Sequence, residues 1–248
     1  MRPSGNTILI TGATGGIGRG LAERFHAAGN TVIIGGRREQ LLADIAAQHP
    51  GMDTVLIDVT DPASITAAVA TVLANHPALN VLVNNAGIML PEDLTDPDHL
   101  SVAQDTVMTN LLGPIRVLTE VVPVLLAQPD AAVVNVSSGL AFVPLPMTPT
   151  YCATKAAIHS YTQSLRVQLA DTSVRVIELV PPAVRTDLMG QAGRGEGMPL
   201  EAFLEEVMSL LDARPDAPEV CVQNVLMMRN ADAEGRHDEI LAMLSAAH

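Results

Sequence analysis

Tyr151 and Lys155 are the residues whose types and spacing best suit proton transfer. They stand four positions apart, so on a helix their side chains project from the same face, one turn apart. A free tyrosine titrates near ~10 and is a poor proton shuttle at neutral pH, but an adjacent ammonium favours the phenolate. The pair therefore predicts a tyrosine with a lowered pKa that acts as a general acid or base. Taken alone, the same spacing is common between side chains on a solvated surface.

A glycine-rich stretch, TGATGGIG, runs from Thr11 to Gly18 after the first predicted strand. Its glycines at positions 12, 16 and 18 allow a tight turn and a close backbone approach to a phosphate, and the helix that begins near Gly16 presents free N–H groups. No Gly-Lys-Ser or Gly-Lys-Thr follows, so an ATP-binding P-loop is not expected. The stretch predicts a phosphate-binding turn at the first strand-to-helix junction.

Arg37 and Arg38 follow the second predicted strand, where a dinucleotide-binding fold contacts the adenosine ribose. An acidic residue at this point binds the 2′-hydroxyl of NAD, whereas arginine accommodates the 2′-phosphate of NADP. The sequence has no acid there, which predicts a preference for NADP over NAD. The alternative is that both arginines are solvated at the start of the next helix.

The elements that must position these residues are predicted by periodicity. Short apolar runs typical of strands buried on both faces alternate with segments of helical period, such as 18–28, 39–48 and 64–74. The predicted strands are Thr7–Thr11, Thr31–Ile34, Thr54–Ile57, Val81–Asn84, Ala132–Val136 and Val174–Val180. The pattern predicts an α/β fold, a doubly wound parallel sheet of the Rossmann type, in one domain over residues 1–248.

The C-terminal part of the sequence predicts helices only. Residues 217–248 have a helical period without a strand-like run, so we expect six strands and a helical tail. A stretch at about 187–215, whose first part is rich in glycine, follows the sixth strand and is predicted to be the substrate loop.

Composition excludes several classes of protein. A net charge of −13 opposes binding to nucleic acid or to anionic lipid. No apolar run approaches the ~18 residues that span a bilayer, and the N-terminal run is too short for a signal peptide. Cys152, Cys221 and the seven histidines show no disulfide or metal-ligand spacing. We expect a cytoplasmic protein with reduced thiols, no metal, no nucleic-acid partner and no membrane.

Other polar residues fall where predicted strands end, the edge at which open parallel sheets bind ligands. Asp58 and Val59 follow the third strand, and the sequence NNAG, residues 84–87, closes the fourth. Asn110 lies within the apolar helical region 98–127, where a buried amide needs hydrogen-bond partners. A site residue and a satisfied core asparagine are both compatible with that position.

Taken together, these motifs resemble the single-domain short-chain dehydrogenase/reductase family. TGATGGIG, NNAG, Asn110, Ser138, YCATK and Pro181-Pro182 occur in the order and spacing of that family over residues 6 to about 188. Two longer stretches, GLAFVPLPMTPTYCATKAA and ELVPPAVRTDL, also resemble its DltE-like group of oxidoreductases. The resemblance implies hydride transfer between a nicotinamide cofactor and a carbonyl or secondary alcohol.

The resemblance also implies a role for each motif residue. Tyr151 would be the acid/base, Lys155 would lower its pKa, Ser138 would hydrogen-bond the reacting oxygen, and Asn110 would anchor a water that links Lys155 to solvent. The implied cofactor contacts run from the pyrophosphate through the adenine and ribose to the nicotinamide: Gly12, Gly16, Ile17, Gly18, Arg37, Arg38, Asp58, Val59, Asn84, Gly87, Tyr151, Lys155, Pro181, Val184 and Thr186.

The sequence departs from the family pattern at two places. Pro182 stands where the family usually has glycine, and it removes an N–H near the expected position of the carboxamide. The second departure is the seventh strand of the family, for which no run is predicted.

The substrate and the assembly are predicted from apolar segments. If the segments after Ser138 and after NNAG line the pocket, as the layout of the family implies, they predict an apolar substrate, although several of their residues could simply pack in the core. The residues are Leu140, Phe142, Val143, Leu145, Met147, Ile88, Met89 and Leu90. Members of the family commonly pair through two long helices and form tetramers through the last strand; only the helices are recognisable here, so the resemblance implies a homodimer through helices 98–127 and 151–170. A partner subunit could cover Val117, Val121, Val124 and Leu125, although packing within the chain could cover them equally well.

Three other functions were weighed against this one. An NADP-binding regulatory or sensor protein on the same fold would keep the glycines but could dispense with the proton relay, whose four residues are all present. Epimerases and dehydratases that share the tyrosine and lysine use a different glycine spacing and a larger C-terminal region. A serine hydrolase is excluded because Ser138 lacks the preceding glycine of G-x-S-x-G.

Overall fold

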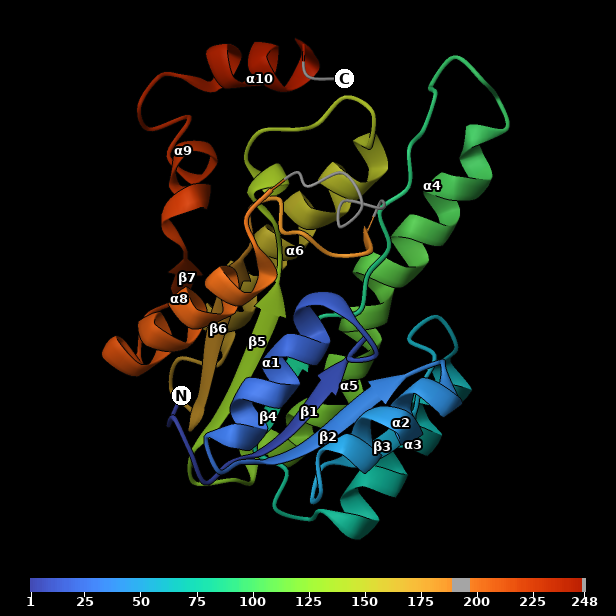
Figure 1. Ribbon diagram of the computed structural model, residues 1–248, viewed down its shortest axis with the longest axis vertical. Helices are drawn as coiled ribbons and strands as arrows, with labels where there is room; N and C mark the ends of the chain where they lie inside the picture. The colour runs from blue at the N-terminus through green and yellow to red at the C-terminus, as the bar shows by residue number, and fades with distance from the viewer. Residues whose placement is uncertain (189–196, 247–248) are drawn as a thin grey trace.

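A computed structural model of the chain describes residues 1–188 and 197–246, and within them a single seven-stranded sheet (Figure 1). All strands pair in parallel, in the order β3-β2-β1-β4-β5-β6-β7. The strands are β1 (Thr7–Thr11), β2 (Thr31–Gly36), β3 (Asp53–Leu56), β4 (Val81–Asn84), β5 (Ala131–Val136), β6 (Val174–Val180) and β7 (Glu219–Cys221). The order reverses between β1 and β4, so the crevice typical of a doubly wound sheet opens there.

Helices cover both faces of the sheet, and each face has its own apolar core. On one side lie α1 (Gly16–Ala27), α2 (Glu39–Gln48) and α8 (Leu200–Ala213). On the other lie α3 (Pro62–Asn75), α5 (Gly113–Leu126) and α6 (Pro149–Gln168). The near-continuous apolar runs of the strands follow from this arrangement, because both sides of every central strand are buried.

The predicted fold class is confirmed, and the strand count was wrong by one. Glu219–Cys221 forms β7 and pairs with β6, with Val220 opposite Leu179. Three residues are too few to show a period, so periodicity does not mark this edge strand. The rest of the C-terminal part is helical, in η4 (Gln223–Val225), α9 (Leu226–Arg229) and α10 (His237–Ala246). Figure 1 shows α10 beyond the carboxyl end of β5.

The long helix predicted over 98–127 has three parts: α4 (His99–Val107), a π-helical turn η1 (Met108–Leu112) and α5. Its span, His99–Leu126, is long and apolar enough to cross a membrane by length and composition. Val117, Val121 and Leu125, however, are fully buried against the sheet. These residues were candidates for a subunit contact, and packing within the chain covers them instead.

Candidate active site

A cavity of about 800 Å³ opens at the carboxyl ends of the strands. Its wall includes most of the residues predicted from the sequence: Gly12, Gly16, Ile17, Gly18, Arg37, Arg38, Asp58, Val59, Gly87, Ser138, Tyr151, Lys155, Pro181, Val184 and Thr186. Two predicted residues, Asn84 and Asn110, lie outside the wall. The substrate loop predicted at about 187–215 falls partly outside the described residues, and most of its described part is α8.

The glycine turn is held closed by the side chain of Asn85. Its Nδ2 donates to the carbonyl oxygens of Thr11 and Gly12, at 3.0 and 3.1 Å. Gly12 has φ +68°, and a Cβ there would lie 2.6 Å from Ala86 Cα; a Cβ on Gly18 would lie 2.3 Å from Asn85 Nδ2. Only glycine fits at these positions, and the backbone at the start of α1 therefore stays open to the cavity. This cradle fits the pyrophosphate of a dinucleotide.

Asn84 is not at the cavity, although the sequence placed it at the adenosine-side ribose. It is buried at the end of β4, and its Nδ2 donates to Asn135 Oδ1 at 3.1 Å and to Pro114 O at 3.4 Å. Side chains alternate between the two faces along a strand, so neighbouring asparagines diverge. Asn85, the residue after the strand, is the one on the cavity wall. Counting that alternation along Val81–Asn84 is the signal that separates them.

The two arginines lie at one end of the cavity with different partners. Arg38 Nε donates to Thr14 Oγ1, at 3.1 Å, in the glycine turn. Arg37 Nη1 lies 3.9 Å from Asp58 Oδ2, and its side chain is 63% exposed. Burial raises the pKa of Asp58, but hydrogen bonds from Thr60 and the charge of Arg37 outweigh it and hold that pKa below its ordinary value. The rim therefore carries positive charge directed at the glycine turn.

Tyr151 and Lys155 lie one turn apart on α6, as predicted, and both are buried. Lys155 Nζ is 5.6 Å from the centre of the tyrosine ring and donates to Val136 O at 2.8 Å. Burial raises the pKa of Tyr151 to about 12, against the lowering effect of Ser138. Burial lowers the pKa of Lys155 to about 8. The predicted lowering of the tyrosine pKa is therefore wrong for this structure, because the cost of burying the phenolate dominates.

Ser138 follows β5 and immediately precedes the short helix η2 (Gly139–Ala141). Its Oγ accepts a hydrogen bond from Leu140 N at 3.1 Å, which leaves the hydroxyl hydrogen free to donate. Pro181 adjoins it, since Pro181 O accepts from Gly139 N at 2.9 Å. The serine hydroxyl and the tyrosine thus stand on the same stretch of cavity wall.

Asn110 lies in the π-helical turn and forms hydrogen bonds with the segment after β4. Its Oδ1 accepts from Ile88 N at 2.8 Å, while its Nδ2 donates to Ile88 O at 2.7 Å and to Thr154 Oγ1 at 3.4 Å. The amide is satisfied by these contacts, and it joins the NNAG segment to α6. Its role in holding a water stays a prediction.

Comparison with known proteins identifies the fold and the chemistry. Residues 6–197 match the family described as short chain dehydrogenase. The chain belongs to this family. The uncharacterized oxidoreductase DltE of Bacillus subtilis is 44% identical over 207 residues, which cover 83% of this chain and 82% of the relative.

Two further relatives have more specific descriptions. Sulfoacetaldehyde reductase 2 of Chromohalobacter salexigens is 35% identical over 185 residues, 73% of each chain. A serine dehydrogenase, solved in a closed form with NADP+, superposes with a TM-score of 0.78 at 26% identity, covering 86% of this chain and 93% of the other. The chain is therefore an NAD(P)-dependent oxidoreductase of the short-chain dehydrogenase family.

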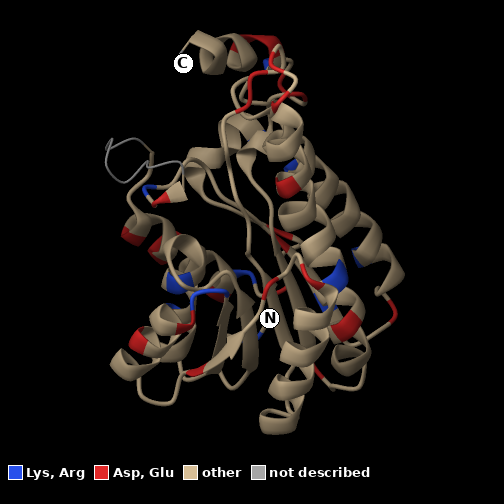
Figure 2. Cartoon of the chain, turned by 90° about the vertical axis from the view of Figure 1, so that its right-hand side faces the viewer, with Lys and Arg blue, Asp and Glu red and all other residues tan. Residues whose placement is uncertain are grey.

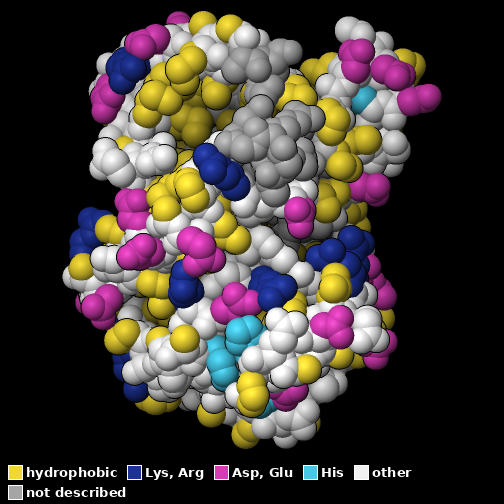
Figure 3. Space-filling model, in the orientation of Figure 1, with side chains coloured by type: hydrophobic (Ala, Val, Ile, Leu, Met, Phe, Trp, Pro, Cys, Tyr) yellow, Lys and Arg dark blue, Asp and Glu magenta, His cyan; other side chains and the backbone are white. Residues whose placement is uncertain are grey.

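Within this family framework, the walls around Tyr151 are apolar. Of the predicted lining residues, Leu140, Leu145, Met147, Ile88 and Met89 lie on the cavity wall. Three do not: Val143 packs under α10, Phe142 meets His159 edge to face, and Leu90 is exposed. Figure 3 shows hydrophobic side chains gathered around α10, on the upper part of the molecule.

Sequence reasoning missed the C-terminal contribution to the cavity. Met228 on α9 and Leu244 on α10 lie on its wall. Nothing local marks these residues, since their helices are ordinary in composition and only the tertiary fold brings them over the strands. Lys155 is the single lysine of the chain, which itself marks that residue in the sequence.

Proposed function

We propose that this chain is an NADP-dependent oxidoreductase that interconverts an apolar ketone or aldehyde and its alcohol. One observation carries the proposal: a single cavity is lined at one end by the glycine turn with Arg37 and Arg38, and at the other by Ser138 with Tyr151 and Lys155. Phosphate-binding groups and proton-transfer groups therefore share one space. When bound there, the nicotinamide supplies or accepts the hydride.

The preference for NADP is supported by the charge around the glycine turn. Basic residues are few and scattered among more numerous acidic ones (Figure 2), yet two adjacent arginines stand at this rim. Position 36 holds glycine, and a Cβ there would lie 2.9 Å from Thr14 Cγ2, so an acidic side chain at the end of β2 would have to displace Thr14. Arg37 and Arg38 can form charge-assisted hydrogen bonds with a 2′-phosphate.

The proton chemistry is supported by the arrangement around Tyr151. The Ser138 hydroxyl can donate to the reacting oxygen and hold it beside the phenol. A phenol whose pKa is raised to about 12 is protonated at neutral pH, which suits donation of a proton to a carbonyl oxygen. The charge of Lys155 stabilises the phenolate left behind. The same groups act in reverse when the alcohol is oxidised.

A cofactor-consumption screen tests the proposal. Apolar and charged ketones, aldehydes and secondary alcohols are offered with NADP(H) and NAD(H) in separate arms, and Tyr151→Phe is run beside the wild type as a control for contaminating enzymes. We expect turnover of apolar carbonyls with NADPH. Turnover confined to highly charged sugars or phosphates, or equal affinity for both cofactors, would contradict it.

A homodimer in the cytoplasm completes the proposal. Exposed apolar side chains on the outer faces of α5 and α6, among them Leu126 and Val167, support pairing through these helices, Val167 being 77% exposed. Light scattering on the purified protein checks the assembly, and a stable tetramer or a micromolar monomer would contradict it.

A further inference from the structure

A row of polar residues crosses the sheet directly beneath the cavity. Asn84 on β4 stands opposite Asn135 on β5, Asn135 opposite Glu178 on β6, and Glu178 opposite Glu219 on β7. Residues in register on parallel strands point to the same face, here the face covered by α6. Asn135 immediately precedes Val136, whose carbonyl oxygen accepts from Lys155. The row therefore lies one residue below the layer that holds the lysine.

Helix α6 meets this row with polar side chains of its own. They recur at the spacing of one helix face and each has a partner on the sheet: Lys155 with Val136 O, His159 with Glu178, Thr162 with Asn135 and Arg166 with Val176 O. An apolar stripe is the usual choice for such a face. On α6 a polar stripe stands beside the apolar Tyr161 and Leu165, which indicates a function in addition to stability.

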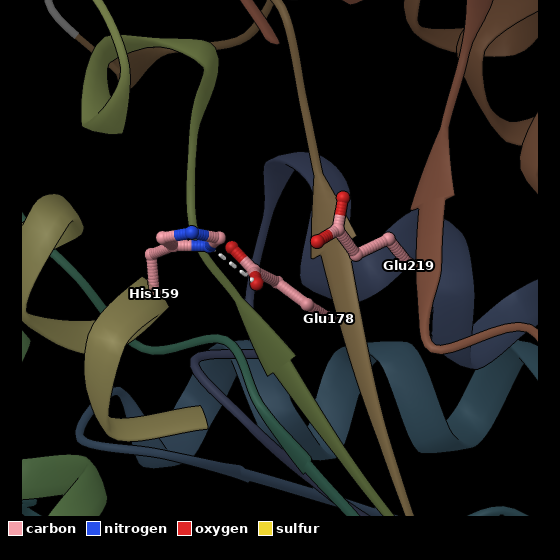
Figure 4. Close-up of side chains that lie close together, drawn as sticks. All are labelled: His159, Glu178 and Glu219. Atoms are coloured by element: carbon pink, nitrogen blue, oxygen red, sulfur yellow. Dashed lines mark hydrogen bonds and ion pairs between the residues drawn. The ribbon is translucent and has the colours of Figure 1, made fainter. Parts of the chain in front are cut away.

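Glu178 is a buried carboxylate in this row, and one of its two oxygens lacks a hydrogen-bond partner in the described part of the chain. Its side chain is fully buried, and Oε2 lies 2.8 Å from His159 Nδ1 (Figure 4). Among the described residues, Oε1 has no hydrogen-bond partner. A buried carboxylate is costly unless it is paired with positive charge. Glu178 therefore needs a positive charge nearby.

Among the charges near Glu178, Lys155 has no ion pair of its own in the described part of the chain. The titratable and charged groups near it come from α6, β7 and α9: Lys155, His159, Arg166, Glu219, Cys221 and Arg229. Arg229 binds both carboxylate oxygens of Glu219, at 2.7 and 3.0 Å, so that pair balances itself. Arg166 donates to the carbonyl oxygens of Val176 and Pro218.

By ligand type, His159, Glu178 and Glu219 could also hold a metal ion, since their ligand atoms lie within 4.8 Å of one another (Figure 4). Arg229, however, already supplies a positive charge to Glu219. An ion would have to displace that guanidinium. The arrangement is better explained by charges within the chain.

We propose that Glu178 is a positioning residue of the active site: its buried carboxylate is the counter-charge that keeps Lys155 protonated, and His159 holds the carboxylate in place. Its catalytic consequence rests on the proposed function, whereas the charge relation itself does not. Burial lowers the pKa of Lys155, and Glu178 is the group that acts in the opposite direction. A neutral Lys155 could not stabilise the phenolate of Tyr151.

The single lysine makes a direct test possible. Protein labelled with ¹³C,¹⁵N-lysine gives one side-chain signal, which reports the protonation of Lys155 alone. We expect Glu178→Gln to move its titration midpoint to lower pH by about one unit. Glu178→Asp, which restores the charge, should return the midpoint toward the wild-type value. Thr162→Val disturbs the same polar row without removing a charge and should leave the midpoint in place.

An unchanged midpoint in Glu178→Gln would overturn the inference, as would an equal shift in Thr162→Val. If Glu178→Gln does not fold, the same titration is done on His159→Gln, which changes the partly exposed residue of the His159–Glu178 pair. Loss of the Nδ1 contact should move the midpoint in the same direction by less, and an unmoved midpoint would again overturn the inference.

Kinetics separates this inference from the proposed function. In Glu178→Gln the alkaline limit of kcat/KM should move to lower pH together with the lysine midpoint. The labelling experiment needs neither substrate nor cofactor, so its result stands even if the cofactor screen finds no turnover. An active wild type whose lysine midpoint is the same in Glu178→Gln would overturn this inference alone.

Discussion

The two faces of the sheet differ most clearly at neighbouring residues of β6. Ile177 and Leu179 point into the apolar core under α1 and α8. Glu178, between them, points to α6 and meets His159. One strand thus serves an apolar core on one side and a polar, charged layer on the other. The difference teaches that part of the α6 face gives up apolar packing to a polar layer near the lysine, while the rest of that face keeps its apolar core under α3 and α5.

The cost of that polar layer can be judged from Lys155. Its pKa falls from an ordinary value of 10.5 to about 8. A shift of this size corresponds to about 3 kcal/mol against the folded state at neutral pH. An Ile or Leu side chain fully buried on the other face contributes about 1.5–3 kcal/mol. One catalytic charge therefore offsets roughly one core side chain.

The largest effect is expected for Tyr151→Phe, on the polar face. Loss of the phenolic proton donor should lower kcat by about 10²- to 10⁴-fold, because general acid catalysis contributes that much. NADPH affinity and the free energy of unfolding should change little. The chain has no tryptophan, so the emission of bound NADPH reports affinity directly. Retention of substantial turnover would remove Tyr151 from the mechanism.

Ile177→Ala tests the apolar face by the opposite pattern. It removes a fully buried side chain and should lower the free energy of unfolding by about 2–5 kcal/mol, measured by denaturant titration. The kcat of the folded protein and its pH dependence should stay close to those of the wild type. Ile177→Val, a matched smaller change, should cost about 1 kcal/mol. A tenfold fall in kcat with the fold retained would show that the two faces are not independent.

Lys155→Met should separate stability from catalysis at a single position. In the folded chain Lys155 has a pKa of about 8, below its ordinary 10.5, so its charge destabilises the folded state below pH 8. This destabilisation disappears as pH rises to 10.5, where the unfolded chain also loses the proton. Between pH 7 and 10.5, the wild type should therefore gain about 3 kcal/mol in free energy of unfolding relative to Lys155→Met.

The loss of the hydrogen bond to Val136 O lowers the stability of Lys155→Met by a similar amount at every pH, so the pH dependence is the clean observable. Activity should be lost throughout. Arg37→Met, at an exposed guanidinium, is the matched control and should show no such pH dependence. If the difference in free energy of unfolding between Lys155→Met and the wild type does not change with pH, the lysine is not desolvated.

The sequence predicted the elements of both faces but not their difference. Continuous apolar runs marked six of the seven strands, because burial on both sides removes the need for alternation. The same feature hid most of the polar row: Asn135 and Glu178 each look like a single interruption of an apolar run. Only the register of the strands places them side by side. Position in the sheet is a tertiary fact that local periodicity does not contain.

The candidate site divides in the same way. Residues in motifs of fixed spacing, such as the glycine turn and the pair on α6, line the cavity as expected. The pKa values were not predictable, because they depend on how deeply Tyr151 and Lys155 are buried and on Glu178. Met228 and Leu244 could not be found either, since α9 and α10 reach the cavity from the far end of the chain.

The smallest effect is expected for the exposed arginines at the rim of the cavity, where a charge contributes little to the stability of the fold. Arg37→Ala and Arg38→Ala should each weaken NADPH binding by roughly ten- to a hundredfold, because a charge-assisted hydrogen bond is worth about 1.5–3 kcal/mol. Arg38 contacts the glycine turn through Thr14, so its loss should have the larger effect.

NADH, which lacks the 2′-phosphate, should bind both variants about as well as the wild type, and NADPH and NADH titrations side by side measure the difference. Stability should change by less than about 0.5 kcal/mol, as for other exposed positions. This is the reverse of Lys155→Met: a surface charge selects the cofactor without lowering stability, whereas the buried charge supports the chemistry and destabilises the fold. Equal losses of NADPH and NADH affinity would show that the arginines shape the pocket and do not recognise the phosphate.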